Sequence, residues 1–355
     1  MSVQSKLKRT LSGIAPVRED LSGETQRRLD NLTKPQGSLG RLEELAKKVV
    51  VITGNEKPVL ANKVIFTMAG DHGIAKEGVS LFPQEVTPQM VYNFVAGGAG
   101  INVLARHVGV RVVVVDMGVA ADLEPHPEIV DKKVGYGTKN MVKEPAMSRE
   151  EAIKALCAGI EVFEEEFQKG IDIVGTGDMG IANTTSSSAI VASITGAEVE
   201  KVTGRGTGIT DKAWQNKVDA IKKALALNRP DPRDPVDVLA KVGGFEIGGL
   251  AGVILAAANH RVPVIIDGFI SGAAALIATG LEPKVNDYLI AAHCSVEIGH
   301  KITLEKMGLK PLLDLDLRLG EGTGAALGMS IVEAGCKILN EMATFESAGV
   351  SEAVE

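Results

Sequence analysis

A glycine-rich segment near the middle of the sequence carries the residues best suited to bind a phosphate. Residues 171–174 read as a short β-strand, residues 175–180 place three glycines at G-x-G-x-x-G spacing, and residues 183–185 (Asn-Thr-Thr) lead into a helix of small side chains. Backbone N–H groups and the positive end of a helix dipole converge in such a segment and favour a bound phosphate. Asp178 lies inside it, where a carboxylate would repel the phosphate, so this residue needs a different role.

The same glycine spacing is also the fingerprint of a dinucleotide-binding loop. Glu200 lies about 20 residues beyond Gly180, where an NAD-dependent oxidoreductase has an acid that binds ribose. However, Asp178 would face the pyrophosphate, and the hydroxyl and amide groups of residues 183–185 suit a terminal monophosphate better. A phosphate-ester site is therefore favoured. An NAD-dependent oxidoreductase, a non-catalytic nucleotide-binding protein and glycines that serve only packing are the alternatives.

A second acidic residue, Glu321, lies between Gly320 and Gly322 in a glycine turn. A carboxylate in such a turn is often a solvated surface charge or a charge at a helix N-terminus. The alternative is a general base, whose pKa apolar neighbours would raise and which the glycines would allow to approach a ligand closely. The residues alone leave both interpretations open.

Other polar residues follow predicted strands. Asp71 and His72 could form an acid–base dyad or bind a metal ion, but no third ligand stands at metal spacing, so a structural role is favoured. Asp267 is a better site candidate, because the following Gly268 keeps its surroundings open. Lys217 could bind a phosphate or lie on a solvated helix face.

The composition is that of an ordinary globular protein. Of 355 residues, 45% are hydrophobic but only 3% aromatic, and 40 are glycine, which favours tightly packed α/β layers over a β-sandwich. A net charge of −7, without a run of Lys and Arg, argues against nucleic-acid binding. The cysteines are widely spaced and form no CxxC pair, as is typical of a reducing compartment. No apolar run approaches the roughly 20 residues of a membrane helix, so we expect a cytoplasmic protein without a membrane partner.

Apolar runs alternate with helical patterns along the chain, which predicts a doubly wound α/β core. Functional loops of such sheets gather at the carboxyl ends of the strands. Residues 120–146 read as a long loop and residues 228–235 as a proline-rich hinge. Strands are expected at residues 64–69, 111–116, 171–174, 262–267 and 288–292, with a possible short strand at 198–202, and helices within 21–53 and at 86–94, 100–107, 148–168, 186–193, 210–227, 246–259, 273–279 and 325–341.

Several blocks in the sequence, taken in order, resemble the nicotinate-nucleotide:dimethylbenzimidazole phosphoribosyltransferase family. This family makes the nucleotide that carries the lower axial base of cobalamin. The blocks cover the chain from about residue 30 to 335, and their order along the chain makes the resemblance far more specific than any one of them. They are residues 32–42, 69–73, 77–87, 175–185, 204–208, 266–271, 293–295 and 315–324.

The resemblance implies a Rossmann-like, three-layer core with a mainly parallel sheet and a smaller helical domain built from both termini. Residues 61–324 would form the large domain. Residues 1–60 and 325–355 would form the small one. Members of the family are homodimers, so the resemblance also implies a second copy of the chain as a partner.

The implied reaction transfers the 5-phosphoribosyl group from nicotinate mononucleotide to 5,6-dimethylbenzimidazole or a related base, with inversion. The products are nicotinate and α-ribazole 5′-phosphate. Nicotinate leaves from a pyridinium, so its departure neutralises the charge of the ring, in contrast with the release of pyrophosphate. The implied enzyme therefore uses no metal ion and no cofactor.

The resemblance also implies roles for individual residues. Glu321 would remove the proton of the attacking base, and Asp178 would stabilise the positive charge that develops on the ribose. The family pattern has Glu where this chain has Asp178, and a frequent Tyr where it has Phe82. The implied phosphate and ribose contacts are Gly180, Ile181, Asn183, Thr184, Thr185, Gly206, Lys217, Asp267 and Ser295, and those to the base are Ser80, Phe82, Gln89 and Leu319.

Overall fold

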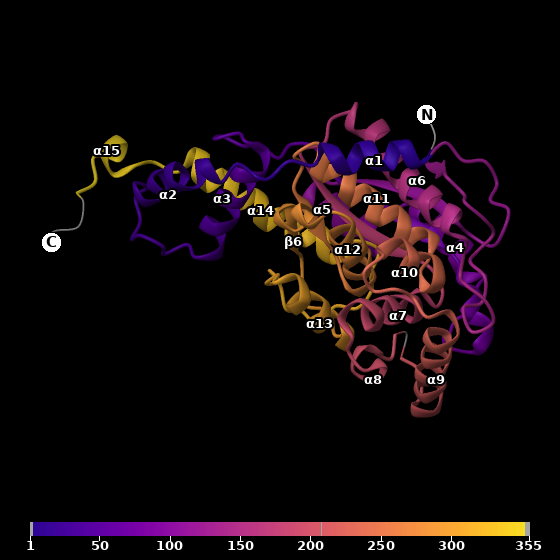
Figure 1. The fold of residues 1–355 in the computed structure, drawn as a ribbon. Coiled ribbons are helices and arrows are strands. Elements are labelled where there is room, and N and C mark those ends of the chain that lie inside the picture. The colour runs from indigo at the N-terminus through magenta and orange to yellow at the C-terminus, as the bar shows by residue number, and fades with distance from the viewer. Residues whose placement is uncertain (1–2, 207, 352–355) are drawn as a thin grey trace.

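The fold is an α/β sandwich around one parallel sheet (Figure 1). The computed structural model describes residues 3–206 and 208–351, so Thr207, which belongs to the matching block 204–208, lies outside the described residues. Within them, six parallel strands follow the order β3-β2-β1-β4-β5-β6, which is the strand order of a Rossmann fold. The predicted fold class is confirmed. The strands are β1 (Lys63–Gly70), β2 (Arg111–Gly118), β3 (Ile129–Asp131), β4 (Ile173–Met179), β5 (Val264–Ile266) and β6 (Leu289–Ala291).

Helices connect the strands and cover the sheet. Local sequence fixes several of their ends. The hydroxyl of Ser148, for example, accepts the backbone N–H of Glu151, and the side chain of Glu151 accepts the backbone N–H of Ser148, which completes a capping box. The α-helices are α1 (Val3–Gly13), α2 (Ser22–Asp30), α3 (Arg41–Thr53), α4 (Val86–Val95), α5 (Gly100–Val108), α6 (Arg149–Phe167), α7 (Asn183–Thr195), α8 (Val199–Val202), α9 (Asp211–Asn228), α10 (Pro235–Val242), α11 (Phe245–Asn259), α12 (Phe269–Leu281), α13 (Ile298–Met307), α14 (Thr323–Glu341) and α15 (Phe345–Ala348). The 3-10 helices are η1 (Glu19–Leu21), η2 (Gly73–Glu77) and η3 (Pro283–Tyr288).

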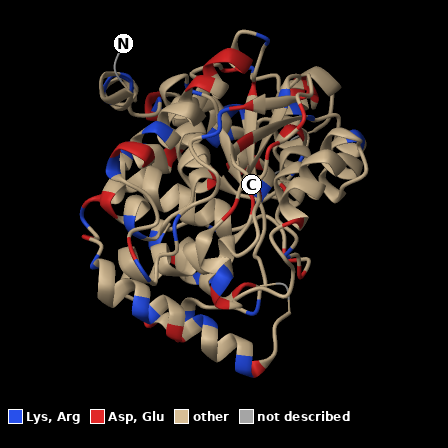
Figure 2. Cartoon of the chain, turned by 90° about the vertical axis from the view of Figure 1, so that its right-hand side faces the viewer, with Lys and Arg blue, Asp and Glu red and all other residues tan. Residues whose placement is uncertain are grey.

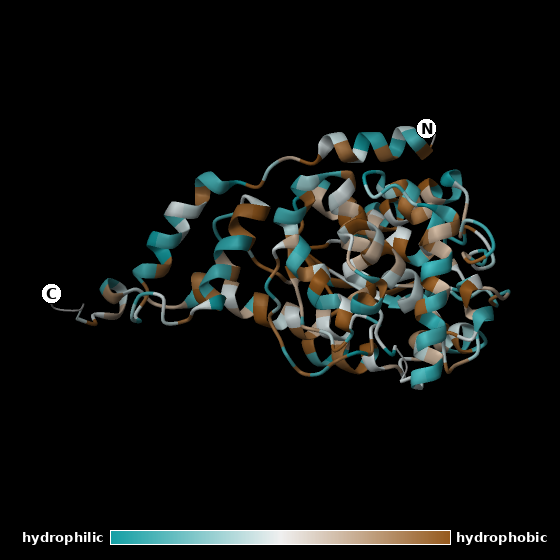
Figure 3. Ribbon diagram, turned by 60° about the horizontal axis from the view of Figure 1, so that its bottom comes forward, coloured by the Kyte–Doolittle hydropathy of each residue, from teal (hydrophilic) through white to brown (hydrophobic). Residues whose placement is uncertain are grey.

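The central strand β1 divides the core into two apolar clusters. Because side chains alternate along a strand, Phe66 and Met68 pack into one cluster with α6, α11 and α12, and Ile65 and Ala69 pack into the other with α3, α5 and α14. Hydrophobic segments accordingly gather inside the α/β part (Figure 3). The continuous apolar runs of the sequence are strands covered on both faces, which gives the three layers.

A smaller helical part projects away from the sheet (Figure 1). Its core joins Leu29 of α2, Ala46 and Val50 of α3, and Leu339 near the end of α14. Helix α14 therefore begins at the sheet and ends in the projection. Helix α1 instead lies on α6, where Lys6 pairs with Glu161. Residues 3–13, which the sequence assigned to the small domain, therefore pack on the α/β part.

Two local predictions need correction. Residues 198–202 do not form a strand; α8 begins at Val199, and its apolar residues Val199 and Val202 are buried at helical spacing. The predicted loop 120–146 contains β3, which extends the sheet beyond β2. Only three residues of β3 pair with β2. Such a short strand gives a weak sequence pattern, and the glycine, proline and charged residues around it are typical of a loop.

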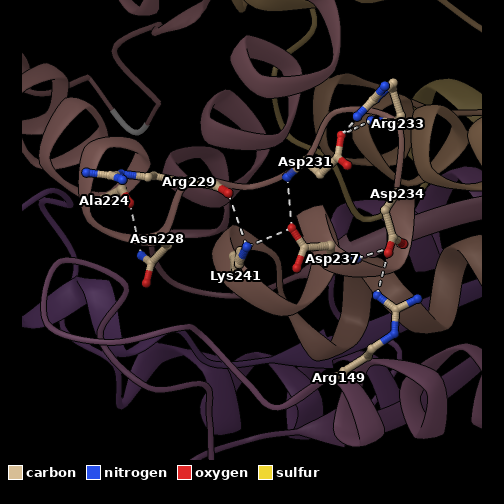
Figure 4. Close-up of polar contacts among 9 residues, drawn as sticks. All are labelled: Arg149, Ala224, Asn228, Arg229, Asp231, Arg233, Asp234, Asp237 and Lys241. Atoms are coloured by element: carbon tan, nitrogen blue, oxygen red, sulfur yellow. Dashed lines mark hydrogen bonds and ion pairs between the residues drawn. The ribbon is translucent and has the colours of Figure 1, made fainter.

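The proline-rich segment 228–235 is held by hydrogen bonds rather than free to act as a hinge (Figure 4). Asp234 caps α10 by accepting the backbone N–H of Asp237 and pairs with Arg149 of α6 at 2.7 Å. Asp237 in turn accepts the N–H of Asp231 at 2.8 Å and the ammonium group of Lys241 at 2.8 Å. These contacts tie the segment to two helices.

Basic residues (Lys and Arg) and acidic residues (Asp and Glu) are interspersed along the outer helices (Figure 2). Among residues 3–206 and 208–351, no helix combines the length and hydropathy needed to cross a membrane.

Candidate active site

The site lies where the strand order of the sheet reverses. The chain runs from β1 to β2 and β3 on one side and then returns through β4 to β5 and β6 on the other, so the connections that leave β1 and β4 lead to opposite halves of the sheet. Ligands of open α/β sheets bind in the crevice that such a reversal leaves at the carboxyl ends of the strands. Asp178 is the penultimate residue of β4, Asp267 directly follows β5, and Ser295 follows β6. Residues far apart in the sequence therefore meet at one edge.

Two of the fingerprint glycines lie in β4 and not in a phosphate-binding loop, which corrects the sequence interpretation. Gly175 pairs with Ile65 of β1, and Gly177 pairs with Thr67. A Cβ atom at Gly177 would overlap the carbonyl group of Glu321, whose turn crosses the strand there. Glycine is needed at this position because another backbone approaches it closely. The loop that enters α7 is only residues 180–182.

The first turn of α7 forms the cationic end of the site. Asn183 and Thr184 lie at the helix N-terminus, where backbone N–H groups and the helix dipole favour an anion. The ammonium group of Lys217, on α9, donates to the hydroxyl of Thr184 at 2.8 Å. Lys217 is 1% exposed, and this burial lowers the pKa of its ammonium group to about 8. A phosphate at this point would be stabilised by the helix dipole and by the buried cation behind the hydroxyl of Thr184.

Asp178 is a buried carboxylate next to the first turn of α7. Its Oδ2 atom accepts a hydrogen bond from the side-chain amide of Asn183 at 2.9 Å, whereas Oδ1 has no hydrogen-bond partner. Burial and the neighbouring carboxylates of Asp267 and Glu246 raise its pKa well above the usual range. A positively charged ligand would stabilise the ionised form, which burial disfavours.

Glu321 occupies a strained turn beside Asp178. Its φ angle is 62°, in the left-handed region, and its N–H donates to the carbonyl oxygen of Asp178 at 3.2 Å. The hydroxyl of Thr67 holds its carbonyl at 2.9 Å, and its Oε2 atom accepts the N–H of Ile101, in the first turn of α5, at 3.0 Å. Burial raises the pKa of this carboxyl group, as a general base requires.

Asp267 supports the turn that carries Glu321. Its two carboxylate oxygens accept the backbone N–H groups of Ala325 at 2.9 Å and Gly322 at 3.3 Å. The carboxylate is completely buried, and this burial raises its pKa to about 7. Asp267 thus accepts hydrogen bonds from backbone N–H groups at the N-terminus of α14. The sequence had predicted a contact to ribose or phosphate and not this one.

These groups surround a cavity of about 400 Å³. Five predicted site residues do not line it: Thr185, Lys217 and Asp267 are buried behind the wall, the Glu321 side chain turns toward α5, and Gln89 is exposed on α4. The predicted residues that line the cavity are Ser80, Phe82, Asp178, Gly180, Ile181, Asn183, Thr184, Gly206, Ser295 and Leu319.

Comparisons with known proteins identify the family. A family model described as a phosphoribosyltransferase matches residues 14–350. The chain belongs to this phosphoribosyltransferase family. It is 60% identical over 346 residues to the nicotinate-nucleotide–dimethylbenzimidazole phosphoribosyltransferase of Geobacter sulfurreducens, covering 98% of each chain, and 59% identical to the enzyme of that name from Chloroflexus aggregans, covering 99% of each. The crystal structure of CobT from Thermus thermophilus superposes with a TM-score of 0.91 at 44% identity, over 94% of this chain and all of that one.

Membership of the phosphoribosyltransferase family does not support the oxidoreductase alternative, and neither does the position of Glu200. Glu200 lies on α8, and its carboxylate pairs with Lys222 on α9 at the protein surface. It does not line the cavity.

Three polar residues at the cavity wall of this phosphoribosyltransferase were not predicted as site residues. His293 precedes Ser295 and has an unpartnered, buried Nδ1 atom; Glu297 has an unpartnered Oε2 atom; and Arg318 donates to the carbonyl oxygen of Gly206 at 3.1 Å. The sequence could have indicated them, because His293 and Glu297 lie two residues from Ser295, and Arg318 is next to Leu319.

Proposed function

We propose that the chain transfers the 5-phosphoribosyl group of nicotinate mononucleotide to 5,6-dimethylbenzimidazole or a related base with inversion, giving α-ribazole 5′-phosphate and nicotinate for the nucleotide loop of cobalamin. The observation that carries the proposal is the charge arrangement of the cavity. Lys217 and the N-terminus of α7 favour an anion at Thr184, and the buried carboxylate of Asp178 lies beside them, within hydrogen-bond distance of Asn183, and favours a cation.

This arrangement suits a donor that is anionic at one end and cationic at the other. The 5-phosphate of nicotinate mononucleotide would bind at the first turn of α7, with the ammonium group of Lys217 directly behind the hydroxyl of Thr184. The positively charged pyridinium and the oxocarbenium-like ribose of the transition state would lie near Asp178, whose charge stabilises them. A pyrophosphate leaving group would be repelled by the same carboxylate.

The acceptor base would bind near the loop 80–82 and Leu319. The side chains of Phe82 and Leu319 are 52% and 59% exposed and line the cavity together with Ser80. A flat aromatic ring could bury against such apolar groups. As one ring nitrogen attacks the anomeric carbon, the proton on the other becomes acidic, and Glu321 would accept it. Gln89, one turn into α4, would contact the base only at the mouth of the site.

We also propose that the protein is a cytoplasmic homodimer with a large domain of residues 61–324 and a small domain drawn from residues 1–60 and 325–355, of which α1 packs on the large domain. The projecting helical part (Figure 1) and the exposed apolar residues Phe82, Leu315 and Leu319 support a dimer. Light scattering should give twice the monomer mass.

The reaction can be tested by incubating the protein with nicotinate mononucleotide in the presence and absence of dimethylbenzimidazole. We expect nicotinate to be released only when the base is present. Tight retention of NAD without release of nicotinate would instead support the dinucleotide alternative.

Replacing Lys217 by Met is expected to raise the KM for nicotinate mononucleotide about 10- to 100-fold, because a charge-assisted hydrogen bond contributes ~1.5–3 kcal/mol. The Met side chain still fills the buried space. In the parent protein the KM should also rise as the pH increases through about 8, where the free enzyme loses the charge of Lys217. This pH dependence should be absent from the variant. A KM that is unchanged by the substitution would show that Lys217 does not contribute to phosphate binding.

A further inference from the structure

Two buried residues directly after β1, Asp71 and His72, each make a hydrogen-bonded connection to the segment that forms the phosphate end of the cavity. Neither residue lines the cavity, and the proposed reaction assigns no step to them. Their backbone follows the central strand at the reversal of the sheet, directly beside the carboxyl end of β4. Their contacts lead to the loop 180–182 and to the start of α7.

Asp71 acts through Thr87, a completely buried residue of α4. The hydroxyl of Thr87 donates to Asp71 Oδ1 at 2.7 Å and accepts the backbone N–H of Ile181 at 3.2 Å. The direction of both bonds is fixed, because an N–H group can only donate and the single hydroxyl proton is used for the carboxylate. The second oxygen of Asp71 accepts the N–H of Ala120 at 2.8 Å, which anchors the carboxylate to the loop after β2.

His72 makes the second connection. One ring nitrogen, Nδ1, lies 2.9 Å from the hydroxyl of Ser186 in the first turn of α7, and the other, Nε2, lies 2.7 Å from a carboxylate oxygen of Glu246. His72 and Glu246 are both completely buried. The imidazole ring therefore has a partner on each side and cannot turn without breaking a buried hydrogen bond.

The segment between the two connections has a conformation that needs support. Ala182 has a φ angle of 74°, which is costly for a residue with a Cβ atom. Ile181 and Ala182 both line the cavity immediately before Asn183. Contacts on both sides, to Ile181 and to Ser186, hold the backbone in this conformation.

We propose that Asp71, acting through Thr87, and His72, acting through Ser186, are positioning residues for the phosphate end of the donor site. The N–H of Ile181 is fixed by the Thr87 hydroxyl, and this contact sets the direction of the cavity-lining backbone at residues 180–183. The inference rests on the proposed function, because the ligand it concerns is nicotinate mononucleotide. It predicts an effect on donor binding that is separate from any effect on the acceptor base.

The test compares Thr87→Val, which keeps the shape of the side chain but removes the hydroxyl, with Thr87→Ser, which keeps the hydroxyl. For Thr87→Val we expect the KM for nicotinate mononucleotide to rise about tenfold while the KM for dimethylbenzimidazole stays within about twofold. Thr87→Ser should restore the donor KM to within about threefold of the parent value. Calorimetric titration with nicotinate mononucleotide alone should show the same order of affinities.

Two further variants separate positioning from general stability. Thr25→Val removes another buried hydroxyl, which donates to the carbonyl oxygen of Leu21 in the small helical part. For this variant we expect a lower melting temperature with both KM values unchanged.

Ser186→Ala removes the partner of His72 and tests the second connection if Thr87→Val fails to fold. This variant should also raise the donor KM. Parent-like donor KM values in Thr87→Val and Ser186→Ala would overturn the inference, as would equal rises for donor and acceptor. An inactive parent protein would instead contradict the proposed function.

Discussion

Glu321→Gln is expected to lower kcat by about 10²–10⁴-fold, the range that general-base catalysis contributes. The amide has nearly the same shape as the carboxylate but cannot accept the proton of the attacking base. Because the turn of Glu321 is held through its backbone by Thr67 and Asp178, the rest of the site should keep its geometry. We therefore expect both substrates to bind with affinities close to those of the parent protein, measured by titration calorimetry.

The pH profile gives an independent test of Glu321. Burial raises the pKa of its carboxyl group, so the acid side of the kcat profile should lie above the usual range of a glutamate. Only the ionised form can act as the base, so activity should fall as the pH decreases through this raised pKa. Turnover of Glu321→Gln equal to that of the parent would exclude Glu321 as the base.

Asp178→Asn is expected to reduce turnover by about 10²–10³-fold, because it removes a buried charge that would stabilise the ribose cation. The same substitution should raise the melting temperature at pH 8 by ~1–3 °C, because it relieves about 1–2 kcal/mol of buried charge repulsion in a chain of 355 residues, whose unfolding entropy is roughly 0.7 kcal/mol/K. The new amide retains an oxygen for Asn183 and places its NH₂ group near the position of the unpartnered Oδ1 atom. Loss of activity would thus accompany a gain in stability.

The sign of this effect follows from the raised pKa of Asp178. The folded state binds its proton more tightly than the unfolded state, so the free energy of unfolding falls as the pH rises from the usual range of an aspartate through the raised pKa. The advantage of the Asn variant should therefore disappear as the pH is lowered. Asp178→Glu, which keeps the charge, should stay within about tenfold of parent activity, or roughly 1.4 kcal/mol. A parent-like melting temperature for the Asn variant at both pH values would contradict the account of a costly buried charge.

Much of the fold could be predicted, because its central elements are strong local patterns. Residues 64–69 and 111–116 are long apolar runs, and they form β1 and β2 within one or two residues at each end. Residues 148–168 combine a capping box with a helical apolar stripe and form α6. Short elements were harder: β3 contains only three paired residues, and residues 198–202 have β-branched residues that the surrounding packing places in a helix.

The site was predictable as a set of loops but not as a set of contacts. Asp178, Asn183 and Thr184 could be placed together because they lie within a few residues of one another at the carboxyl end of one strand. The need for glycine at position 177 could not be predicted from the neighbouring sequence, because the backbone that approaches it belongs to Glu321, far along the chain. For the same reason the carboxylate of Asp267 was assigned to the ligand, although its partners are backbone N–H groups 55 and 58 residues away.

The charges of the cavity suit direct transfer of the phosphoribosyl group from a cationic donor to an attacking base. Direct transfer is tested by analysing the products of nicotinate mononucleotide and dimethylbenzimidazole by proton NMR. We predict equal amounts of nicotinate and ribazole 5′-phosphate, with the product entirely in the α configuration at the anomeric carbon. A β-configured product, or nicotinate released together with free ribose 5-phosphate, would contradict direct transfer with inversion.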